Sequence, residues 1–256
     1  MERWVAVTGA SSGIGAELAR VFAARGYATV LVARRRERLE ALAAELAAKH
    51  GAATHVLPLD LQDSAAPAAL IDGLAARGIE LHTLVNNAGF GLRGAFAELP
   101  LEEQLGLVQL NVTALTHLSR LVLPGLLERR RGGILNLAST AAFQPGPGMA
   151  VYYASKAFVL SLSEALHEEA RPHGVTVTAL CPGPSETEFQ ERARMQVPGA
   201  LRLALVDAAA VARAGVDGYE AGRAVVIPGA VNRFLALGVK FGPRALVRRT
   251  VSRMQR

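Results

Sequence analysis

Tyr152 and Lys156 are the two residues whose types and spacing most directly suggest chemistry. They are four positions apart in a stretch with helical periodicity, so their side chains lie on one helix face. A free phenol has a pKa of about 10 and exchanges protons poorly at neutral pH. A neighbouring ammonium group lowers that pKa, so the pair suits general acid–base catalysis. Tyr153 is only three positions before Lys156 and is expected to point to a different side. Taken alone, Tyr152 has an alternative interpretation, because an isolated aromatic on a helix more often packs into the core.

Two further polar residues, Ser139 and Asn111, are candidates for the same site. Ser139 follows the predicted strand 133–137, and its hydroxyl can donate to a substrate carbonyl and to a developing alkoxide. An isolated serine in this position more often caps the next turn. Asn111 lies inside a helical pattern although asparagine is a poor helix former, so its presence there needs a reason.

Residues 8–15 form a glycine-rich turn between the first predicted strand and the first predicted helix. Glycine lets the backbone turn sharply and approach a bulky anion, and a helix N-terminus offers unpaired N–H groups to a pyrophosphate. The spacing GxxxGxG differs from the GxGxxG dinucleotide fingerprint, so a turn without a ligand is the alternative. The turn residues predicted to bind a nucleotide are Gly9, Ser11, Ser12, Gly13, Ile14 and Gly15.

Strands and helices alternate along the whole chain, and no linker or repeat divides it. The predicted strands cover residues 4–8, 29–32, 55–59, 81–85, 133–137, 175–180 and 224–227, and the predicted helices 14–25, 36–50, 64–77, 101–127, 149–170 and 207–221. Pro124 is expected to end or bend the long helix. Strands that are apolar on both faces and separated by helices indicate one doubly wound, Rossmann-type α/β domain with a parallel sheet of about seven strands. In this architecture ligands bind beyond the carboxyl ends of the strands.

Arg34 and Arg35 follow the second strand, where the ribose of an adenine nucleotide lies in a doubly wound fold. An acidic residue there accepts hydrogen bonds from a free 2′-hydroxyl, whereas guanidinium groups suit a 2′-phosphate. The alternative is a solvated helix start, where cations oppose the helix dipole slightly. We therefore expect NADP(H) rather than NAD(H), with Arg34 as the main contact and Arg35 as a helper.

Taken in order, these motifs resemble the short-chain dehydrogenase/reductase family, and the likeness covers residues 5–229. Residues 8–15 match its TGxxxGxG turn, and residues 86–89 match its NNAG motif. The resemblance implies a catalytic tetrad of Asn111, Ser139, Tyr152 and Lys156, in which the family spacing selects Tyr152 over Tyr153 and Asn111 bends a helix whose backbone holds a water. It implies further cofactor contacts at Asp60, Leu61, Asn87, Ala88, Gly89, Tyr152, Lys156, Pro182, Gly183 and Thr187.

The predicted substrate is a hydrophobic ketone, aldehyde or secondary alcohol. Apolar residues flank the predicted site residues and suggest an apolar pocket, although each is equally compatible with ordinary packing. They are Phe90, Leu92, Phe143, Met149, Pro184, Phe189 and Met195.

The net charge of +6 is concentrated in residues 230–256, which carry seven basic and no acidic residues, so the remainder is nearly neutral. We expect this basic, amphipathic extension of domain 1–229 to pack on the body or on a twin subunit in a homodimer or homotetramer. The alternative, in which the extension has a binding function, is weak contact with anionic lipid or with a charged acyl substrate. Nucleic-acid binding is not expected, because the run lacks a recognition motif. The single cysteine, Cys181, and the absence of a signal peptide and of metal-ligand clusters favour a metal-free cytoplasmic protein.

Two rival functions fit the same fold. A catalytically idle NADP-binding sensor or scaffold needs the glycine turn but has little need for an aligned tetrad. An epimerase or dehydratase normally needs a longer carboxyl-terminal substrate lobe than the residues after Pro182 provide. The complete tetrad therefore favours hydride transfer, with Ser139 orienting the carbonyl oxygen and Tyr152 protonating it.

Overall fold

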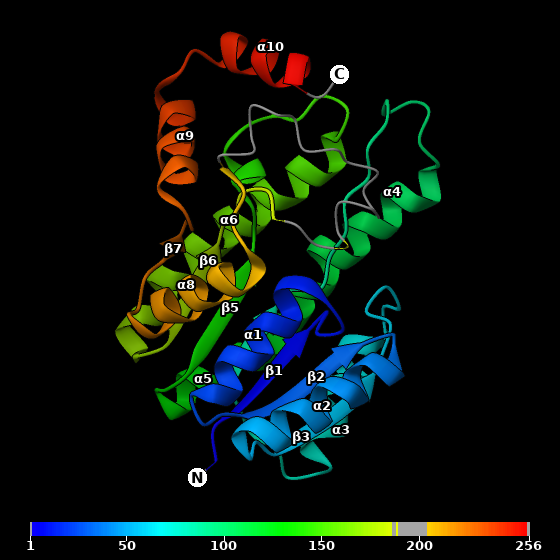
Figure 1. Cartoon of the computed structure of the whole chain (residues 1–256), viewed down its shortest axis with the longest axis vertical. Coiled ribbons are helices and arrows are strands. Elements are labelled where there is room, and N and C mark those ends of the chain that lie inside the picture. Colours follow the sequence, from blue (N-terminus) through cyan, green and yellow to red (C-terminus); the bar gives the residue numbers. More distant parts are fainter. Residues whose placement is uncertain (1, 186–187, 189–203, 255–256) are drawn as a thin grey trace.

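The computed structural model of the protein describes residues 2–185, 188 and 204–254. Within these residues lies a seven-stranded sheet in the order β3-β2-β1-β4-β5-β6-β7, and each neighbouring pair is parallel. The predicted doubly wound parallel sheet is confirmed (Figure 1). The strands are β1 (Trp4–Thr8), β2 (Ala28–Ala33), β3 (Thr54–Pro58), β4 (Leu81–Asn86), β5 (Gly133–Leu137), β6 (Thr176–Leu180) and β7 (Val225–Val226).

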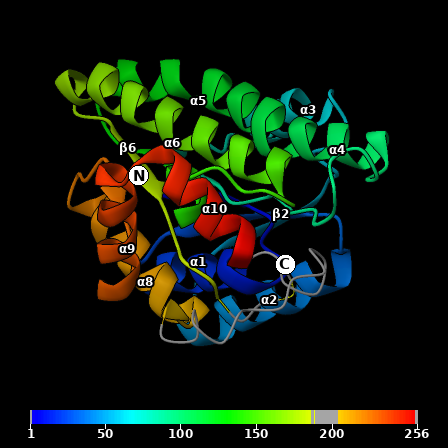
Figure 2. The same ribbon diagram turned by 90° about the horizontal axis from the view of Figure 1, so that it is seen from above.

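Helices cover both faces of this sheet because its strands are apolar on both faces (Figure 2). Within β1, Val5 and Val7 belong to one buried cluster, while Ala6 between them belongs to another. The first cluster is completed by α1 (Gly13–Ala24), α2 (Arg36–His50) and α8 (Ala208–Glu220), and the second by α3 (Ala66–Ala75) and α5 (Leu115–Arg129). The period-two alternation of side chains thus builds two cores from one strand.

The strand order changes direction at β1, which pairs with β2 on one side and with β4 on the other. The connection that follows β1 leads to β2, and the connection that follows β4 leads to β5 on the other side. The two connections therefore leave in opposite directions and open a crevice at the carboxyl ends of the strands. The glycine turn follows β1, and the Asn86–Gly89 stretch begins at the end of β4, so both lie at this crevice.

The predicted helix 101–127 consists of three segments. α4 (Leu101–Val108) is followed by a π-helical segment, η1 (Gln109–Ala114), and then by α5. Pro124 lies inside α5, which continues to Arg129, so of the two expected effects proline does not end this helix. Proline removes a single backbone N–H, and the carbonyl that loses its partner belongs to Arg120, an exposed residue.

A buried chain of side-chain hydrogen bonds ties β4 and β5 to the helices behind them. The Nδ2 of Asn86 donates to Ser119 Oγ on α5 at 3.0 Å and to Asn136 Oδ1 on β5 at 2.9 Å. Asn136 Nδ2 in turn donates to Ser163 Oγ at 3.0 Å. Ser163 belongs to α6 (Ala150–Ala170), so this chain connects the strand end near the crevice to the helix that carries Tyr152.

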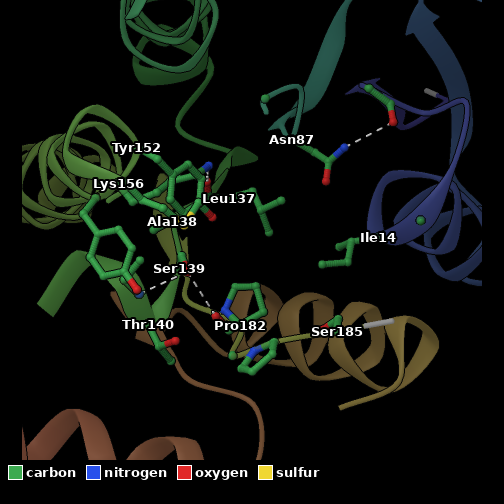
Figure 3. Close-up of a pocket in the computed structure, with 18 of the residues that line it drawn as sticks. Ile14, Asn87, Leu137, Ala138, Ser139, Thr140, Tyr152, Lys156, Pro182 and Ser185 are labelled. Carbon is green, nitrogen blue, oxygen red and sulfur yellow. Dashed lines mark hydrogen bonds between the residues drawn. The ribbon is translucent and has the colours of Figure 1, made fainter. Parts of the chain in front are cut away.

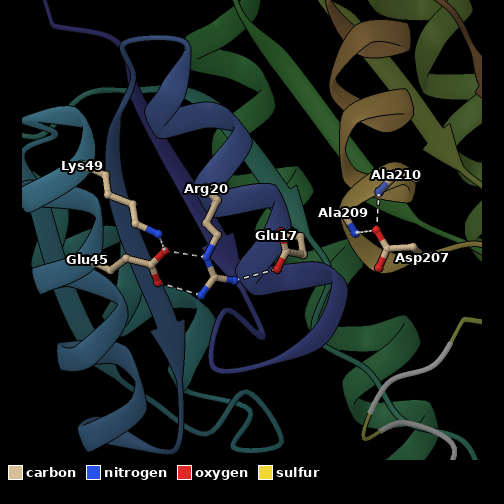
Figure 4. A network of polar contacts seen from close by, with 7 residues as sticks. All are labelled: Glu17, Arg20, Glu45, Lys49, Asp207, Ala209 and Ala210. Atoms are coloured by element: carbon tan, nitrogen blue, oxygen red, sulfur yellow. Dashed lines mark hydrogen bonds and ion pairs between the residues drawn. The ribbon is translucent and has the colours of Figure 1, made fainter.

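On the opposite face, charged residues hold α1 against α2 (Figure 4). Arg20 lies between Glu17 at 2.7 Å and Glu45 at 2.8 Å, and Lys49 donates to Glu45 at 2.8 Å. The hydrogen bond from Arg20, aided by Lys49, lowers the pKa of Glu45 to about 2. The same figure shows Asp207 capping α8, where its carboxylate accepts from the backbone N–H groups of Ala209 and Ala210.

The basic carboxyl-terminal extension forms two helices, α9 (Ala230–Phe241) and α10 (Arg244–Met254). They lie at the crevice end of the sheet, away from the N-terminus (Figure 1). Among the described residues, no helix is both long and apolar enough to span a bilayer, and no cluster of metal-ligating side chains occurs.

Candidate active site

A cavity of about 1200 Å³ occupies the crevice at the carboxyl ends of the strands. Its walls are the glycine turn, the ends of β2, β4, β5 and β6, the first turns of α6, and both carboxyl-terminal helices. In Figure 3, Ile14 and Asn87 lie on one side of the cavity, and Tyr152, Lys156 and Ser139 lie on the other. The fold therefore brings the predicted nucleotide residues and the predicted catalytic residues into one space.

The glycine turn has the geometry of a cradle that side chains cannot occupy. Gly9 and Gly13 have φ values of +67° and +55°, in the left-handed region. A Cβ on Gly15 would collide with the carbonyl oxygen of Gly9 and with Asn87 Nδ2. Asn87 Nδ2 donates to the Thr8 carbonyl at 2.9 Å, which locks the turn to the end of β4.

The N-terminus of α1 is open toward the cavity. Its first residue is Gly13, and the N-cap residue Ser12 makes no side-chain capping hydrogen bond. The first backbone N–H groups of a helix then remain available to an anion, and the helix dipole favours negative charge there. A dinucleotide pyrophosphate fits this cradle.

Arg34 and Arg35 both line the cavity, but they make different contacts. Arg34 Nη1 lies 3.5 Å from Asp60 Oδ2, the other predicted cofactor residue in this region. Arg35 reaches the glycine turn, where Nη2 donates to Ser11 Oγ at 2.9 Å and to Ser12 Oγ at 2.8 Å. The cation bound to the turn is thus Arg35, while the assignment of Arg34 as the main contact of a 2′-phosphate stays a prediction.

Tyr152 and Lys156 are both buried, with exposed fractions of 9% and 5%, and both line the cavity. Lys156 Nζ lies 5.9 Å from the centre of the Tyr152 ring and donates to the Leu137 carbonyl at 2.6 Å. Tyr153 also lines the cavity, where a Cβ on Gly146 would collide with its ring, so the two adjacent tyrosines share one space.

Burial dominates the proton affinities of the pair in the protein alone. It raises the pKa of the Tyr152 phenol, and a hydrogen bond with Ser139 opposes that rise only in part. Burial also lowers the pKa of Lys156 to about 8. The pKa of the Tyr152 phenol is therefore raised rather than lowered in the protein alone, because desolvation is the largest cause of its shift, and Tyr152 carries its proton at neutral pH.

Ser139 has the capping role that the sequence offered as the alternative, and its hydroxyl also faces the cavity. It caps the short 3₁₀ segment η2 (Thr140–Phe143), since its Oγ accepts from Ala141 N at 3.1 Å. The same hydroxyl faces the cavity, donates to the Pro182 carbonyl at 3.4 Å and bonds with Tyr152. Capping thus fixes the serine beside the phenol.

Asn111 lies in the π-helical segment and is 1% exposed, behind the cavity wall rather than on it. Its side-chain amide pairs with the backbone of Phe90, donating to the carbonyl at 3.0 Å and accepting from the N–H at 3.1 Å. It also donates to Ser155 Oγ at 3.1 Å. A Cβ on Gly89 would lie 2.9 Å from Asn111 Oδ1 and 3.7 Å from Lys156 Nζ, so Asn111 and Lys156 flank this glycine.

The remaining predicted residues divide into three groups. Phe143, Met149 and Pro184 line the cavity, as do the predicted cofactor residues Asp60, Leu61, Asn87, Ala88, Gly89, Pro182 and Gly183. Phe90 and Leu92 are not among the lining residues; they pack with Leu107, Met149 and Tyr152 in a small core, so their assignment to the pocket surface is wrong. Thr187, Phe189 and Met195 lie outside the described residues.

Several polar residues of the cavity were missed by sequence reasoning, among them Arg38, Glu188 and Asn232. Arg38 lies in the first turn of α2, three positions after the N-cap residue Arg35, and this closeness in sequence was available as a signal. Asn232 lies in α9 against Gly183, and its Nδ2 donates to the carbonyls of Ala204 and Pro228. No local signal connects position 232 to position 183.

The profile of the short chain dehydrogenase family matches residues 3–198. This match covers most of the chain, and it agrees with the sheet order and with the position of the cavity. The chain therefore belongs to the short-chain dehydrogenase/reductase family, as the resemblance predicted.

Individual relatives differ in what they act on. A very-long-chain 3-oxoacyl-CoA reductase from Phaeosphaeria nodorum is 38% identical over 183 residues, which cover 68% of this chain and 52% of that protein. The chain thus spans about half the length of that relative. A serine 3-dehydrogenase from Rhizobium radiobacter is 39% identical over 190 residues, which cover 74% of each. Among solved structures, a short-chain dehydrogenase from Sphingobium yanoikuyae in complex with NADPH is 36% identical, with a TM-score of 0.83 over 98% of this chain and 95% of that one.

Proposed function

We propose that the chain is an NADP(H)-dependent oxidoreductase that transfers a hydride between nicotinamide and a hydrophobic ketone, aldehyde or secondary alcohol. The observation that carries this proposal is the position of one buried tyrosine. Tyr152 bonds with Ser139 and lies beside Lys156, in the same cavity as a glycine cradle and arginine side chains. The Sphingobium yanoikuyae relative in complex with NADPH supports a nicotinamide cofactor.

The residues that would hold the cofactor fit its chemistry. The glycine cradle and the open N-terminus of α1 suit the pyrophosphate, and the cationic side chains at the end of β2 suit a 2′-phosphate. Other solved relatives carry NAD or NADH, so the preference for NADP(H) rests on Arg34 and Arg35 of this chain. The cofactor supplies or accepts the hydride when bound.

The side chains then divide the remaining work in the reductive direction. Ser139 donates a hydrogen bond to the substrate oxygen, which orients it and stabilises its developing charge. Tyr152, which burial keeps protonated, gives its proton to that oxygen. Lys156 returns a proton to the phenol, and Asn111 keeps the π-helical turn in place so that its backbone can hold the relaying water.

The apolar side of the cavity supports a hydrophobic substrate. Helices α9 and α10 supply much of this wall, through residues such as Phe234, Leu235 and Val251. Phe234 is 76% exposed although it lines the cavity, which places it at the mouth. We therefore assign the extension to substrate enclosure, ahead of contact with lipid or with a twin subunit.

Phe234→Ser is expected to raise KM for bulky apolar ketones roughly tenfold, because a substrate loses one large apolar contact. A small ketone that does not reach the mouth should keep its KM. Phe96→Ser is the matched control, since Phe96 is 65% exposed and does not line the cavity. Steady-state kinetics of both variants check this, and equal effects on large and small ketones would remove α9 from the substrate wall.

The proposed function is tested by mixing the protein with NADPH or NADH and a panel of carbonyl compounds of increasing apolar size. We expect loss of reduced-nicotinamide absorbance, with kcat/KM roughly 10- to 100-fold higher for NADPH, as one charge-assisted phosphate site predicts. Tight NADPH binding with no turnover across the panel would favour the rival, a cofactor-binding sensor. Epimerase activity would appear instead as interconversion of alcohol epimers without net oxidation of NADPH.

A further inference from the structure

The arginines at the end of β2 hold a carboxylate of the protein itself. Glu188 Oε2 accepts from Arg35 Nη1 at 2.8 Å, and Glu188 Oε1 accepts from Arg38 Nη1. All three side chains line the large cavity. Glu188 lies beyond β6 in the chain, whereas Arg35 is the N-cap residue of α2 and Arg38 lies in its first turn, so this contact joins segments about 150 positions apart.

The same guanidinium group of Arg35 also contacts the glycine turn. Its Nε and Nη2 donate to Ser11 Oγ, and Nη2 donates to Ser12 Oγ, while Nη1 is directed to Glu188. Arg35 is thus held by the turn on one side and by the carboxylate on the other. The position taken by the carboxylate oxygens is the one that a phosphate needs for charge-assisted hydrogen bonds from Arg35 and Arg38.

The Glu188 carboxylate stays charged at physiological pH, but another anion can displace it from the arginines. Hydrogen bonds from Arg35 and Arg38 lower the pKa of Glu188 to about 2, so it stays ionised at physiological pH. Yet the side chains of Arg35, Glu188 and Arg38 are 42%, 45% and 51% exposed, and exposed ion pairs contribute little to stability. A phosphate group with up to two negative charges binds such a pair of arginines more strongly than one carboxylate does.

We infer that Glu188 competes within the chain for the 2′-phosphate of the cofactor, so that it weakens the binding of NADP(H) and leaves that of NAD(H) unchanged. This inference rests on the proposed use of NADP(H). Before the 2′-phosphate can bind, the contacts of Glu188 with Arg35 and Arg38 must break. A nucleotide without that phosphate leaves the contacts in place. Glu188 therefore sets how strongly the protein discriminates between the two cofactors.

The experiment measures binding alone, by calorimetry, with 2′,5′-ADP (one phosphate at 2′ and one at 5′) and 5′-AMP as probes that differ only in the 2′-phosphate. Glu188→Gln should bind 2′,5′-ADP roughly 3- to 10-fold more tightly than the unmodified protein, as expected from the loss of two exposed ion pairs. Its affinity for 5′-AMP should stay within about twofold. Glu40→Gln is the matched control, because it removes the same charge from a pair with Arg36 on α2.

Arg38→Gln provides a second, independent measurement. In that background the gain from Glu188→Gln should shrink, because one of the two contacts is already missing. An undiminished gain would show that the effect does not pass through Arg38 and would overturn the inference.

The other outcomes are equally decisive. Weaker binding of 2′,5′-ADP by Glu188→Gln would mean that the carboxylate orients the arginines for the phosphate, which contradicts competition. Equal tightening for both probes, or the same tightening in Glu40→Gln, would reduce the effect to net charge and also overturn it. If the unmodified protein and Glu188→Gln both bind the two probes equally, the proposed NADP(H) preference fails and the inference with it. If the unmodified protein prefers the probe with the 2′-phosphate and Glu188→Gln leaves this preference unchanged, the inference is overturned while the proposed NADP(H) preference stands.

Discussion

Replacing Tyr152 with phenylalanine is expected to lower kcat by roughly 10²- to 10⁴-fold, the usual contribution of a positioned general acid. The variant lacks the only atom of this side chain that can carry a transferable proton. NADPH binding should change little, because the glycine cradle and the arginines at the end of β2 are untouched. Single-substrate kinetics give the first quantity, and calorimetry with NADPH gives the second.

Tyr153→Phe is the matched control for this substitution. Tyr153 also lines the cavity, with its ring 6.0 Å from the ring of Tyr152, so both variants lose one hydroxyl from the same space. Only Tyr152 is followed four positions later by a buried lysine. We expect Tyr153→Phe to keep most of the activity; the reverse pattern would assign the proton transfer to Tyr153.

Lys156→Met is expected to lower kcat by roughly 10²-fold or more while it stabilises the cofactor-free protein at pH 7 by about 1–2 kcal/mol. The ammonium is 5% exposed, and among the described carboxylates none forms an ion pair with it. Removing this charge relieves its desolvation, although the hydrogen bond to the Leu137 carbonyl is lost. Urea unfolding at pH 7 measures the stability.

The pH dependence of that difference separates the charge from simple packing. Burial lowers the pKa of Lys156 to about 8 from the ordinary 10.5. Below pH 8 the amine is protonated in both the folded and the unfolded chain, so the cost of burying the charge is fully present. Between about pH 8 and 10.5 the unfolded chain binds more protons than the folded one, so the stability of the unmodified protein rises, by at most about 1.4 kcal/mol per pH unit.

The advantage of Lys156→Met should therefore shrink as the pH rises through this interval. Lys49→Met serves as the control, because it removes the same charge from an exposed residue of α2 and involves no burial of an ammonium. A stability difference for Lys156→Met that stays constant from pH 7 to 10 would contradict a buried ammonium.

The sequence by itself determined the parts of this protein that depend on local pattern. Strand and helix periods predicted the parallel sheet, because apolar residues on both faces of a strand need cover on both sides. The turn at residues 8–15 was readable because the positive φ of Gly9 and Gly13 and the close approach at Gly15 require glycine. The spacing of Tyr152 and Lys156 was readable because helix geometry places such pairs on one face.

Only the tertiary structure decided what depends on contacts between distant segments. The choice of Arg35 over Arg34 at the glycine turn, and the contact of Arg35 with Glu188, join residues from three separate segments. The extension from Ala230 onward showed a basic, apolar composition in the sequence, but its place over the cavity depends on how α9 packs near Gly183. Periodicity reports which face of an element is buried, whereas the partner across that face is set by the three-dimensional packing of the chain.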